Sequence, residues 1–406
     1  MSGLRGPLEH ITVLANEQYI AGPYCTMLLA DAGARVIKVE RPGSGDPRRT
    51  MGPFLEVDGE KHSWGFAEYN RNKKSVALDL SKEEGKDIFK ALARASDVVV
   101  ENFRPGVMDK LGLGYSPLKM ENPRLVFCAI SGFGQLDGYR GPYSDWPAFD
   151  IVSEAMSGVM HMIGFEDRPP VSALYGLADL IAGQAAVQGI LIALLDRDRT
   201  GEGQMVDISM LDAMVALNER VMTIYSFTGQ VPIRGNERLF GPRGAYRSRD
   251  GYVAINIPSD YMWERLAACM GREDLIGDPR CADGRSRAAH SEDLIRPAIE
   301  NWLEDKDSLE AANILNSAGV PGGPVHTAEE VFKCPQVAAR NMLSPIHSGP
   351  LAGKKLVRTP IRLSDSTEIA AKGIPALGEH TDEVLTQILG YQGTRLDHLR
   401  QDGIIG

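Results

Sequence analysis

Short runs of β-branched and aliphatic residues alternate with amphipathic stretches along the N-terminal third of the chain. Strands are predicted at 11–14, 35–40, 72–79, 97–101 and 124–131. Helices are predicted between them at 24–32 and from 81 to about 95, where Ser81 and Glu84 have the spacing of a capping box. Because strands that alternate with helices form a parallel sheet covered on both faces, this pattern predicts a doubly wound α/β domain.

The pattern becomes mainly helical after about residue 149. Helices are predicted at 150–159, from Asp179 to near Leu195 and at 211–227, with a polar turn at 196–203 and a strand at 204–210. A hairpin at 246–256, with Asp250-Gly251 at its turn, and helices near 261–270, 291–303 and 308–318 then indicate a smaller α+β domain. We therefore expect a large domain at 1–228, a small domain at 229–325, and a return segment at 326–406 that completes the large one, with a helix near 381–389.

Composition narrows the class of protein. The chain has 406 residues, of which 43% are hydrophobic and 24% charged, and its formal net charge is -10. These values are ordinary for a globular protein and exclude a disordered chain, a collagen and a coiled coil. The negative charge argues against nucleic acid and anionic membranes as general partners.

The cysteines, histidines and apolar runs define the expected setting. The five cysteines form no C-x-x-C pair, which indicates free thiols in a reducing compartment. The eight histidines show no metal-ligand spacing, so no metal is expected. Residues 1–7 carry no signal-peptide pattern, and the longest apolar run, 180–195, contains Gln184 and Gln188 and is too short to span a membrane. We expect a cytoplasmic protein without a membrane segment.

The first strand–helix–strand unit has the layout of a nucleotide-binding domain. Its turn at 18–23 contains no G-x-G-x-x-G, which disfavours a nicotinamide enzyme. Basic residues gather where the predicted strands begin or end: Arg41, Arg48 and Arg49, then Arg71, Lys73 and Lys74, then Arg104 and Lys110. A solvated charged rim would explain any one group, but three groups in one acidic chain favour a phosphate-bearing ligand.

Asp179 opens the apolar helix and is the sharpest single candidate for catalysis. An aspartate at or near a helix N-cap accepts backbone N–H groups and is favoured by the helix dipole, so we expect its carboxylate to stay ionised. An ionised carboxylate can act as a nucleophile, and nearby N–H groups can stabilise an oxyanion. The alternative is that Asp179 only caps the helix, as most aspartates at such positions do.

At this point a set of motifs resembles a known family, the class III CoA-transferases, which include formyl-CoA transferase and carnitine CoA-transferase. The matching stretches occur in the family's order at 21–23, 29–34, 36–46, 72–79, 101–106, 200–204, 318–325 and 377–382. Each stretch is weak by itself, and the combination is specific. Asp179, with Gly183 four positions later, resembles the family's catalytic aspartate.

The resemblance implies a mechanism with no tightly bound cofactor, in which coenzyme A thioesters are substrates. The Asp179 carboxylate would attack a donor acyl-CoA to form a mixed anhydride. CoA thiolate would then form an aspartyl-CoA thioester, and a free carboxylic acid would reverse the steps as acceptor. A thioester-level intermediate conserves the activation of the acyl group without ATP, but the site must exclude water.

The resemblance also implies positions along CoA and an architecture. It places CoA along Arg41, Leu78, Asn102, Phe103 and Lys110, with Arg104 nearby, and it places Tyr19 and Ala21 near the thioester. The expected fold is a large Rossmann-like domain plus a small domain in an interlocked dimer. The partner is either a second copy or a paralogous subunit.

Two other functions stay open from the sequence. The related 2-methylacyl-CoA racemases have a histidine where this chain has Phe149, so an acid/base relay across an α-carbon lacks one partner. A non-catalytic CoA-binding subunit of a mixed transferase is the other alternative. The loop at 234–240, glycine-rich in several transferases, has one glycine here, and Arg234, Arg238 or Arg243 could pair with a second carboxylate on a dicarboxylic acceptor.

Overall fold

The chain folds into two compact units. The computed structural model describes residues 6–234, 240–366, 369 and 371–406. Unit 1 comprises Met1–His161, Ser172–Phe227 and Arg340–Gly406, and unit 2 comprises Met162–Val171 and Thr228–Ala339. Unit 2 therefore extends past the expected end at 325, because α15 (Ala328–Lys333) and α16 (Pro335–Ala339) belong to it.

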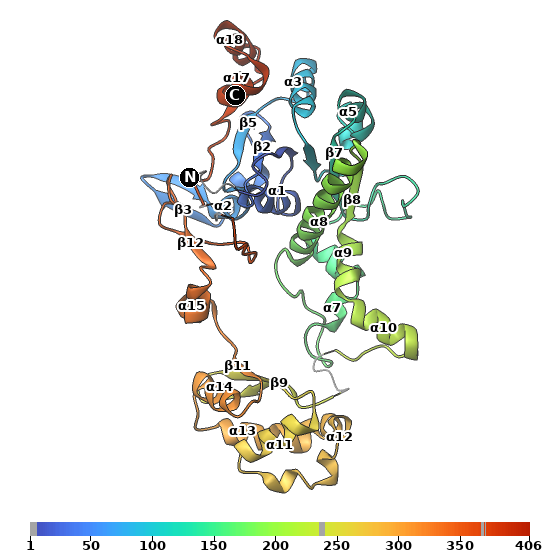
Figure 1. Cartoon of the computed structure of the whole chain (residues 1–406), viewed down its shortest axis with the longest axis vertical. Coiled ribbons are helices and arrows are strands. Elements are labelled where there is room, and N and C mark those ends of the chain that lie inside the picture. The colour runs from blue at the N-terminus through green and yellow to red at the C-terminus, as the bar shows by residue number, and fades with distance from the viewer. Residues whose placement is uncertain (1–5, 235–239, 367–368, 370) are drawn as a thin grey trace. The chain divides into compact units, whose positions relative to one another are not determined.

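Unit 1 is built around a six-stranded parallel sheet, which confirms the predicted fold class (Figure 1). Its strands, in spatial order, are β5 (Lys74–Ala77), β2 (Arg35–Glu40), β1 (Thr12–Asn16), β6 (Val98–Glu101), β7 (Val126–Ser131) and β8 (Met205–Ser209). Each was predicted from its apolar run. Hydrophobic side chains alternate along the strands, so Val13 and Ala15 face one side of the sheet and Leu14 the other.

Helices cover both faces of this sheet. One face packs against α1 (Ala21–Asp31) and the long helix α8 (Leu177–Thr200). The other packs against α3 (Glu83–Arg94), α5 (Tyr115–Glu121), α17 (Thr381–Leu389) and α18 (Thr394–Gln401). The C-terminal segment therefore completes the large unit, and α18 was not predicted.

Three local predictions were wrong. The Ser81 hydroxyl binds the Asp79 carboxylate instead of capping a helix, and α3 begins at Glu83. The predicted polar turn at 196–203 is largely helical, because α8 continues until Gly201 ends it at φ 83°. The helix expected at 211–227 is divided into α9 (Met210–Leu217) and α10 (Glu219–Thr228).

Unit 2 is a small α+β unit with its own core. The predicted hairpin is confirmed as β9 (Arg243–Arg247) and β10 (Tyr252–Asn256), and β11 (Gly322–Pro324) pairs antiparallel with β10. Three helices carry most of the buried apolar side chains: α11 (Asp260–Cys269), α13 (Arg296–Leu303) and α14 (Ser308–Ser317).

The remaining elements are short. In unit 1 they are a 3-10 turn (Pro47–Arg49), β3 (Phe54–Val57), β4 (Glu60–Ser63), α2 (Trp64–Asn70), α4 (Val107–Lys110), α6 (Asp150–Met156), β12 (Leu343–Pro345) and β13 (Lys355–Val357). The helix α7 (Val159–Met162) joins the units along the chain. In unit 2 they are 3-10 turns (Glu273–Leu275 and Pro279–Cys281), α12 (Gly284–Ala289) and a π-helical turn (Ser291–Ile295).

All five cysteines are free thiols, as predicted. Helix α8 is long and apolar enough to cross a membrane by length and composition, although the apolar run had been judged too short. Its buried side chains, including Ala182, Ala186 and Ile190, pack in the hydrophobic core against the sheet, so α8 is a core helix of unit 1. Within the described residues, no group of three or more His, Cys, Asp or Glu side chains could hold a metal ion.

Candidate functional site

The order of the strands identifies the edge of the sheet where a ligand would bind. β1 pairs with β2 on one side and with β6 on the other, and all three strands are parallel. Strands that precede β6 in the sequence are added on one side of β1, and the later strands are added on its other side, so the strand order switches between β1 and β6. In open parallel sheets, ligands bind outside the carboxyl ends of the strands at such a switch point. The segments that follow β1 and β6 meet there, because the Asn102 side chain accepts from the Gln18 N–H and donates to the Gln18 carbonyl, both at 2.8 Å.

The backbone that follows β1 is strained. Tyr19 has φ 63°, a left-handed conformation that non-glycine residues seldom adopt. Its N–H donates to Asp46 at 3.3 Å, and its ring meets Phe149 edge-on at 5.7 Å between centroids. Strain of this kind persists where the surroundings hold it, and it clusters at functional sites. Ala21, two residues later, begins α1.

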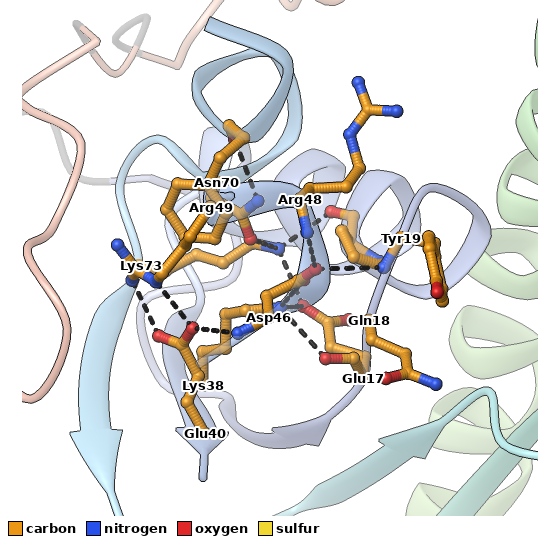
Figure 2. A network of polar contacts seen from close by, with 12 residues as sticks. Glu17, Gln18, Tyr19, Lys38, Glu40, Asp46, Arg48, Arg49, Asn70 and Lys73 are labelled. Atoms are coloured by element: carbon orange, nitrogen blue, oxygen red, sulfur yellow. Dashed lines mark hydrogen bonds and ion pairs between the residues drawn. The ribbon is translucent and has the colours of Figure 1, made fainter. Parts of the chain in front are cut away.

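A buried polar network lies directly beneath this segment (Figure 2). The Lys38 ammonium donates to the Asp46 carboxylate at 2.9 Å and to the Glu17 carbonyl at 3.0 Å. The Lys73 ammonium donates to the Glu17 carboxylate at 2.7 Å. The side chains of Glu17, Lys38, Asp46 and Lys73 are all fully buried. The network therefore fixes both ends of the Glu17–Tyr19 turn.

Charge pairing sets the pKa values in this network. Burial alone would lower the pKa of Lys38, but the carboxylates of Asp46 and Glu17 outweigh burial and raise it. Burial lowers the pKa of Lys73 to about 8, against the opposing effect of Glu17. For Glu40, hydrogen bonds and charge from Arg49 outweigh burial, and its pKa falls to about 2. Each acid of this cluster therefore has a cation as its partner, and the low pKa of Glu40 keeps that carboxylate ionised.

Asp179 occupies the first turn of α8, not the N-cap. The helix begins at Leu177 after Gly176, which has no side chain for capping. The carboxylate of Asp150, the first residue of α6, takes this role by accepting the N–H groups of Gly176 at 2.9 Å and Ala178 at 2.7 Å. The predicted capping role of Asp179 was therefore wrong, because a distant aspartate already satisfies the first N–H groups.

The expectation that Asp179 stays ionised is also corrected. Burial and, next, the charge of Asp150 raise the pKa of Asp179 to about 7, against the lowering effects of the backbone N–H of Ala21 and the charge of Arg48. At neutral pH the carboxyl group is therefore divided between its two protonation states. A carboxylate with so high a pKa is a stronger base, and hence a better nucleophile, than an exposed aspartate.

The basic residues fall into two classes. Five of the residues grouped near strand ends form ion pairs within the fold: Arg48 with Glu68, Arg49 with Glu40, Arg71 with Asp31, Lys73 with Glu17 and Lys74 with Glu383. Arg41, Arg104 and Lys110 are exposed, and none of them makes an ion pair with another residue that the structure describes. Arg41 follows β2, Arg104 follows β6 and Lys110 ends α4; the family resemblance places Arg41 and Lys110 along CoA, with Arg104 nearby.

Three other residues expected along CoA have roles in the fold. Leu78 is buried in the core and bridges to Ile405. The Phe103 ring packs partly against the same core, and the Asn102 amide is engaged with Gln18. Beside this segment a cavity of about 310 Å³ is lined by residues that include Glu101, Gly106 and Tyr115.

The arginines proposed for a dicarboxylic acceptor lie in unit 2. Arg238 falls outside the described residues. Arg234 donates to the backbone carbonyl of Arg168, and Arg243 begins β9. Phe149, the position of the racemase histidine, is an exposed aromatic ring with no group that transfers a proton.

Sequence reasoning missed Asp150 and the pair Lys38–Asp46. A usable signal existed for Lys38, because a lysine inside the apolar strand 35–40 is buried only when it is paired. No comparable signal existed for Asp150, since its contact with α8 spans 28 residues of sequence.

Comparison with known proteins shows which family the chain is similar to. A family model described as CoA-transferase family III matches residues 8–381. A succinyl-CoA:mesaconate CoA-transferase from Haloarcula hispanica is 39% identical, with 94% of this chain and 96% of the relative covered. A succinyl-CoA–D-citramalate CoA-transferase from Chloroflexus aurantiacus is 36% identical, with 98% of each covered. The crystal structure of a CAIB/BAIF family protein from Brucella suis superposes with a TM-score of 0.84 at 34% identity, covering 95% of this chain and 100% of that one.

Proposed function

The chain belongs to CoA-transferase family III and is an enzyme that transfers CoA, and we propose that it does so through covalent intermediates on Asp179. The observation that carries this proposal is the state of that carboxylate. It is largely buried at the start of α8, has a pKa of about 7, and receives the backbone N–H of Ala21 from the strained segment after β1. A basic carboxylate is suited to attack a thioester, and an N–H donor beside it is suited to stabilise the oxyanion that follows.

The reaction balances in four steps. An Asp179 Oδ attacks the donor thioester carbonyl, which forms the mixed anhydride and releases CoA thiolate. The thiolate attacks the Asp179 carbonyl, which forms the aspartyl-CoA thioester and releases the donor carboxylate. The acceptor carboxylate attacks that thioester, which forms a second mixed anhydride with Asp179 and releases CoA thiolate. The thiolate then attacks the acceptor carbonyl of this anhydride. The new acyl-CoA leaves and the Asp179 carboxylate is restored, with no net proton transfer.

We further propose that donor and acceptor are dicarboxylic. The two relatives described above are named for succinyl-CoA as donor and for mesaconate or D-citramalate as acceptor, and all three carry a second carboxylate. The CoA moiety would lie along Arg41, Arg104 and Lys110, whose side chains have no ion-pair partner among the described residues. A racemase is less well supported, because Phe149 cannot complete an acid/base pair.

Intact-mass analysis tests the covalent role of Asp179. Wild-type protein incubated with succinyl-CoA, and separately quenched with hydroxylamine, is expected to gain a CoA adduct and a hydroxamate that map to Asp179. Asp179→Asn should give neither and should lose transfer by at least about 10³-fold, while its CoA affinity stays within about tenfold. Asp196→Asn is the matched control, since Asp196 lies in the last turns of α8 and pairs with Arg199. Transfer by Asp179→Asn at the wild-type rate, or an adduct on another residue, would refute the mechanism.

We also propose a cytoplasmic homodimer. Helix α10 has no buried residue, and Ile192 and Leu195 are exposed on α8 with 66% and 72% of their surface accessible. Exposed apolar faces of this kind favour a second copy as the covering partner. Light scattering on the purified chain checks this assembly, and a monomer that has full activity would contradict it.

A further inference from the structure

Arg48 has a buried guanidinium group that the fold holds in a fixed orientation. Its side chain is 8% exposed, its Nε donates to the Gly65 carbonyl at 2.9 Å, and its Nη2 donates to Glu68 at 2.9 Å. A Cβ on Gly65 would lie 2.7 Å from Arg48 Nη2, so a larger residue at position 65 would displace the guanidinium from this position. Its backbone N–H is held by Asp46, which also holds Tyr19.

One nitrogen of this group remains available. A guanidinium has five N–H donors, and within the described residues the polar partners of the Arg48 side chain account for Nε and Nη2 alone. Nη1 keeps some exposed surface, because the fully buried side-chain atoms without a hydrogen-bond partner do not include it. In Figure 2 the Arg48 guanidinium points away from the network of Lys38 and Asp46. The Nη1 edge of the guanidinium is therefore directed away from the buried ion pair of Lys38 and Asp46.

A chain of aromatic contacts leads from Arg48 to the helix that carries Asp179. The guanidinium lies 5.5 Å from the centroid of the Tyr69 ring, and Tyr69 meets Tyr24 edge-on at 5.9 Å. The Tyr24 hydroxyl accepts from the Gln184 side chain on α8 at 3.3 Å. The Tyr24 ring also lies against Gly183, one turn after Asp179. The charge of Arg48 lowers the pKa of Asp179.

We propose that Arg48 is the specificity-determining residue that binds the distal carboxylate of a dicarboxylic acyl group while the proximal carbonyl reacts at Asp179. This assignment rests on the proposed function and deepens it. Nη1 supplies the donors, the bonds to Gly65 and Glu68 preorganise them, and the partly desolvated position strengthens a charge-assisted hydrogen bond. A monocarboxylic acyl group of the same length would leave Nη1 without this partner.

The test compares two acyl groups of equal length on one variant. Arg48→Met keeps an unbranched side chain and removes the cation. For succinyl-CoA, kcat/KM is expected to fall by about 10- to 150-fold, the range for loss of a hydrogen bond to a charged group. For butyryl-CoA, which lacks the distal carboxylate, kcat/KM should change by less than about threefold, because no charged hydrogen bond is lost.

Arg197→Met is the matched control, because Arg197 is also buried and pairs with one carboxylate, Asp97, at the far end of α8. Its ratio of succinyl-CoA to butyryl-CoA activity should equal that of the wild type. Circular dichroism establishes that each variant is folded. If Arg48→Met does not fold, Arg48→Lys replaces it, and the same selectivity ratio must fall because a lysine cannot keep the Gly65 and Glu68 bonds and also reach the substrate.

The outcomes separate this inference from the proposed function. An equal loss of activity toward both acyl groups, or an unchanged ratio, would overturn the role of Arg48 even if Asp179 still forms its CoA adduct. Failure of wild-type protein to form any adduct would instead overturn the proposed function. A fall in the ratio with a retained adduct would establish both.

Discussion

Two groups of carboxylates, one buried and one half-buried, lie close to the same edge of the sheet, and the pKa shifts of Glu40 and Asp179 in them have opposite directions. In the network under the Tyr19 segment, each acid has a cation within hydrogen-bond distance, such as Lys38 on Asp46 at 2.9 Å and Arg49 on Glu40 at 2.7 Å. At the start of α8, Asp179 has another acid, Asp150, as its strongest charged neighbour. The pKa of Glu40 falls to about 2, whereas that of Asp179 rises to about 7.

The difference shows that burial alone does not make a carboxylate reactive. Desolvation opposes ionisation in both regions, and the supply of paired cations decides the result. The paired acids stabilise the strained segment after β1, whereas the pKa of Asp179 stays raised. In the proposed mechanism, the first region would provide the rigidity that the second needs for chemistry.

Removing the cation at the centre of the network should have the largest effect on stability. Lys38→Met leaves Asp46 and Glu17 buried without their shared partner, so the free energy of unfolding is expected to fall by about 3–5 kcal/mol. Urea denaturation measures this change. Lys86→Met is the control, because Lys86 pairs with an exposed Glu83 and its loss should cost less than about 1 kcal/mol. Equal losses in both variants would show that the buried network is not stabilising.

Substituting one acid from each region should change stability in opposite directions at pH 7. Asp179→Asn is expected to stabilise the protein by about 1–3 kcal/mol, because it removes a charge that burial disfavours. Glu40→Gln should destabilise it by a similar amount, because it removes the paired partner of Arg49. Thermal or urea unfolding of the two variants at a series of pH values provides the measurement.

The pH dependence distinguishes the two effects. The folded pKa of Asp179 is raised, so its contribution to stability is present below the unfolded value near 3.8 and is lost as the pH rises through about 7. The advantage of Asp179→Asn should therefore grow across that window. The folded pKa of Glu40 is lowered, so its contribution is present above the unfolded value near 4.5 and is lost as the pH falls through about 2. Stability curves that run parallel for both variants would contradict this assignment.

The sequence specified the sheet well and the helix ends poorly. Each strand of the parallel sheet is a short buried run, such as 98–101, whose composition admits few alternatives. Helix ends depend on contacts made elsewhere, and α8 continues past the polar residues at 196–200, where Arg197 binds Asp97, which is 100 residues away in sequence. Such contacts have no local pattern.

The same division applies to the site. Asp179 could be selected from its place at a helix start, but its protonation could not, because Asp150 and Arg48 reach it from other segments. Most of the grouped basic residues proved to be partners of acids such as Asp31 and Glu383, which are distant in sequence. Position along the chain identifies candidate residues, and only the fold shows which charges are paired.

The smallest expected effect concerns Asp150, whose charge raises the pKa of Asp179. Asp150→Asn removes that charge, so the pH at which Asp179 becomes acylated to half its maximal rate should fall below about 7. The variant also loses one acceptor for the first N–H groups of α8, which should cost about 1 kcal/mol of stability. Rapid-quench measurement of acylation by succinyl-CoA between pH 5 and 8 follows the change.

The same substitution at another helix start is the control. Asp283 caps α12 in unit 2 by accepting the Ser286 N–H at 2.7 Å, so Asp283→Asn removes a charge there and should leave the acylation profile unmoved. If both variants shift the profile equally, the shift reflects general loosening of the fold. If only Asp150→Asn shifts the acylation profile to lower pH, the carboxylate that caps α8 also raises the pKa of Asp179 in the first turn of that helix. The contrast with the paired network then follows from charge alone.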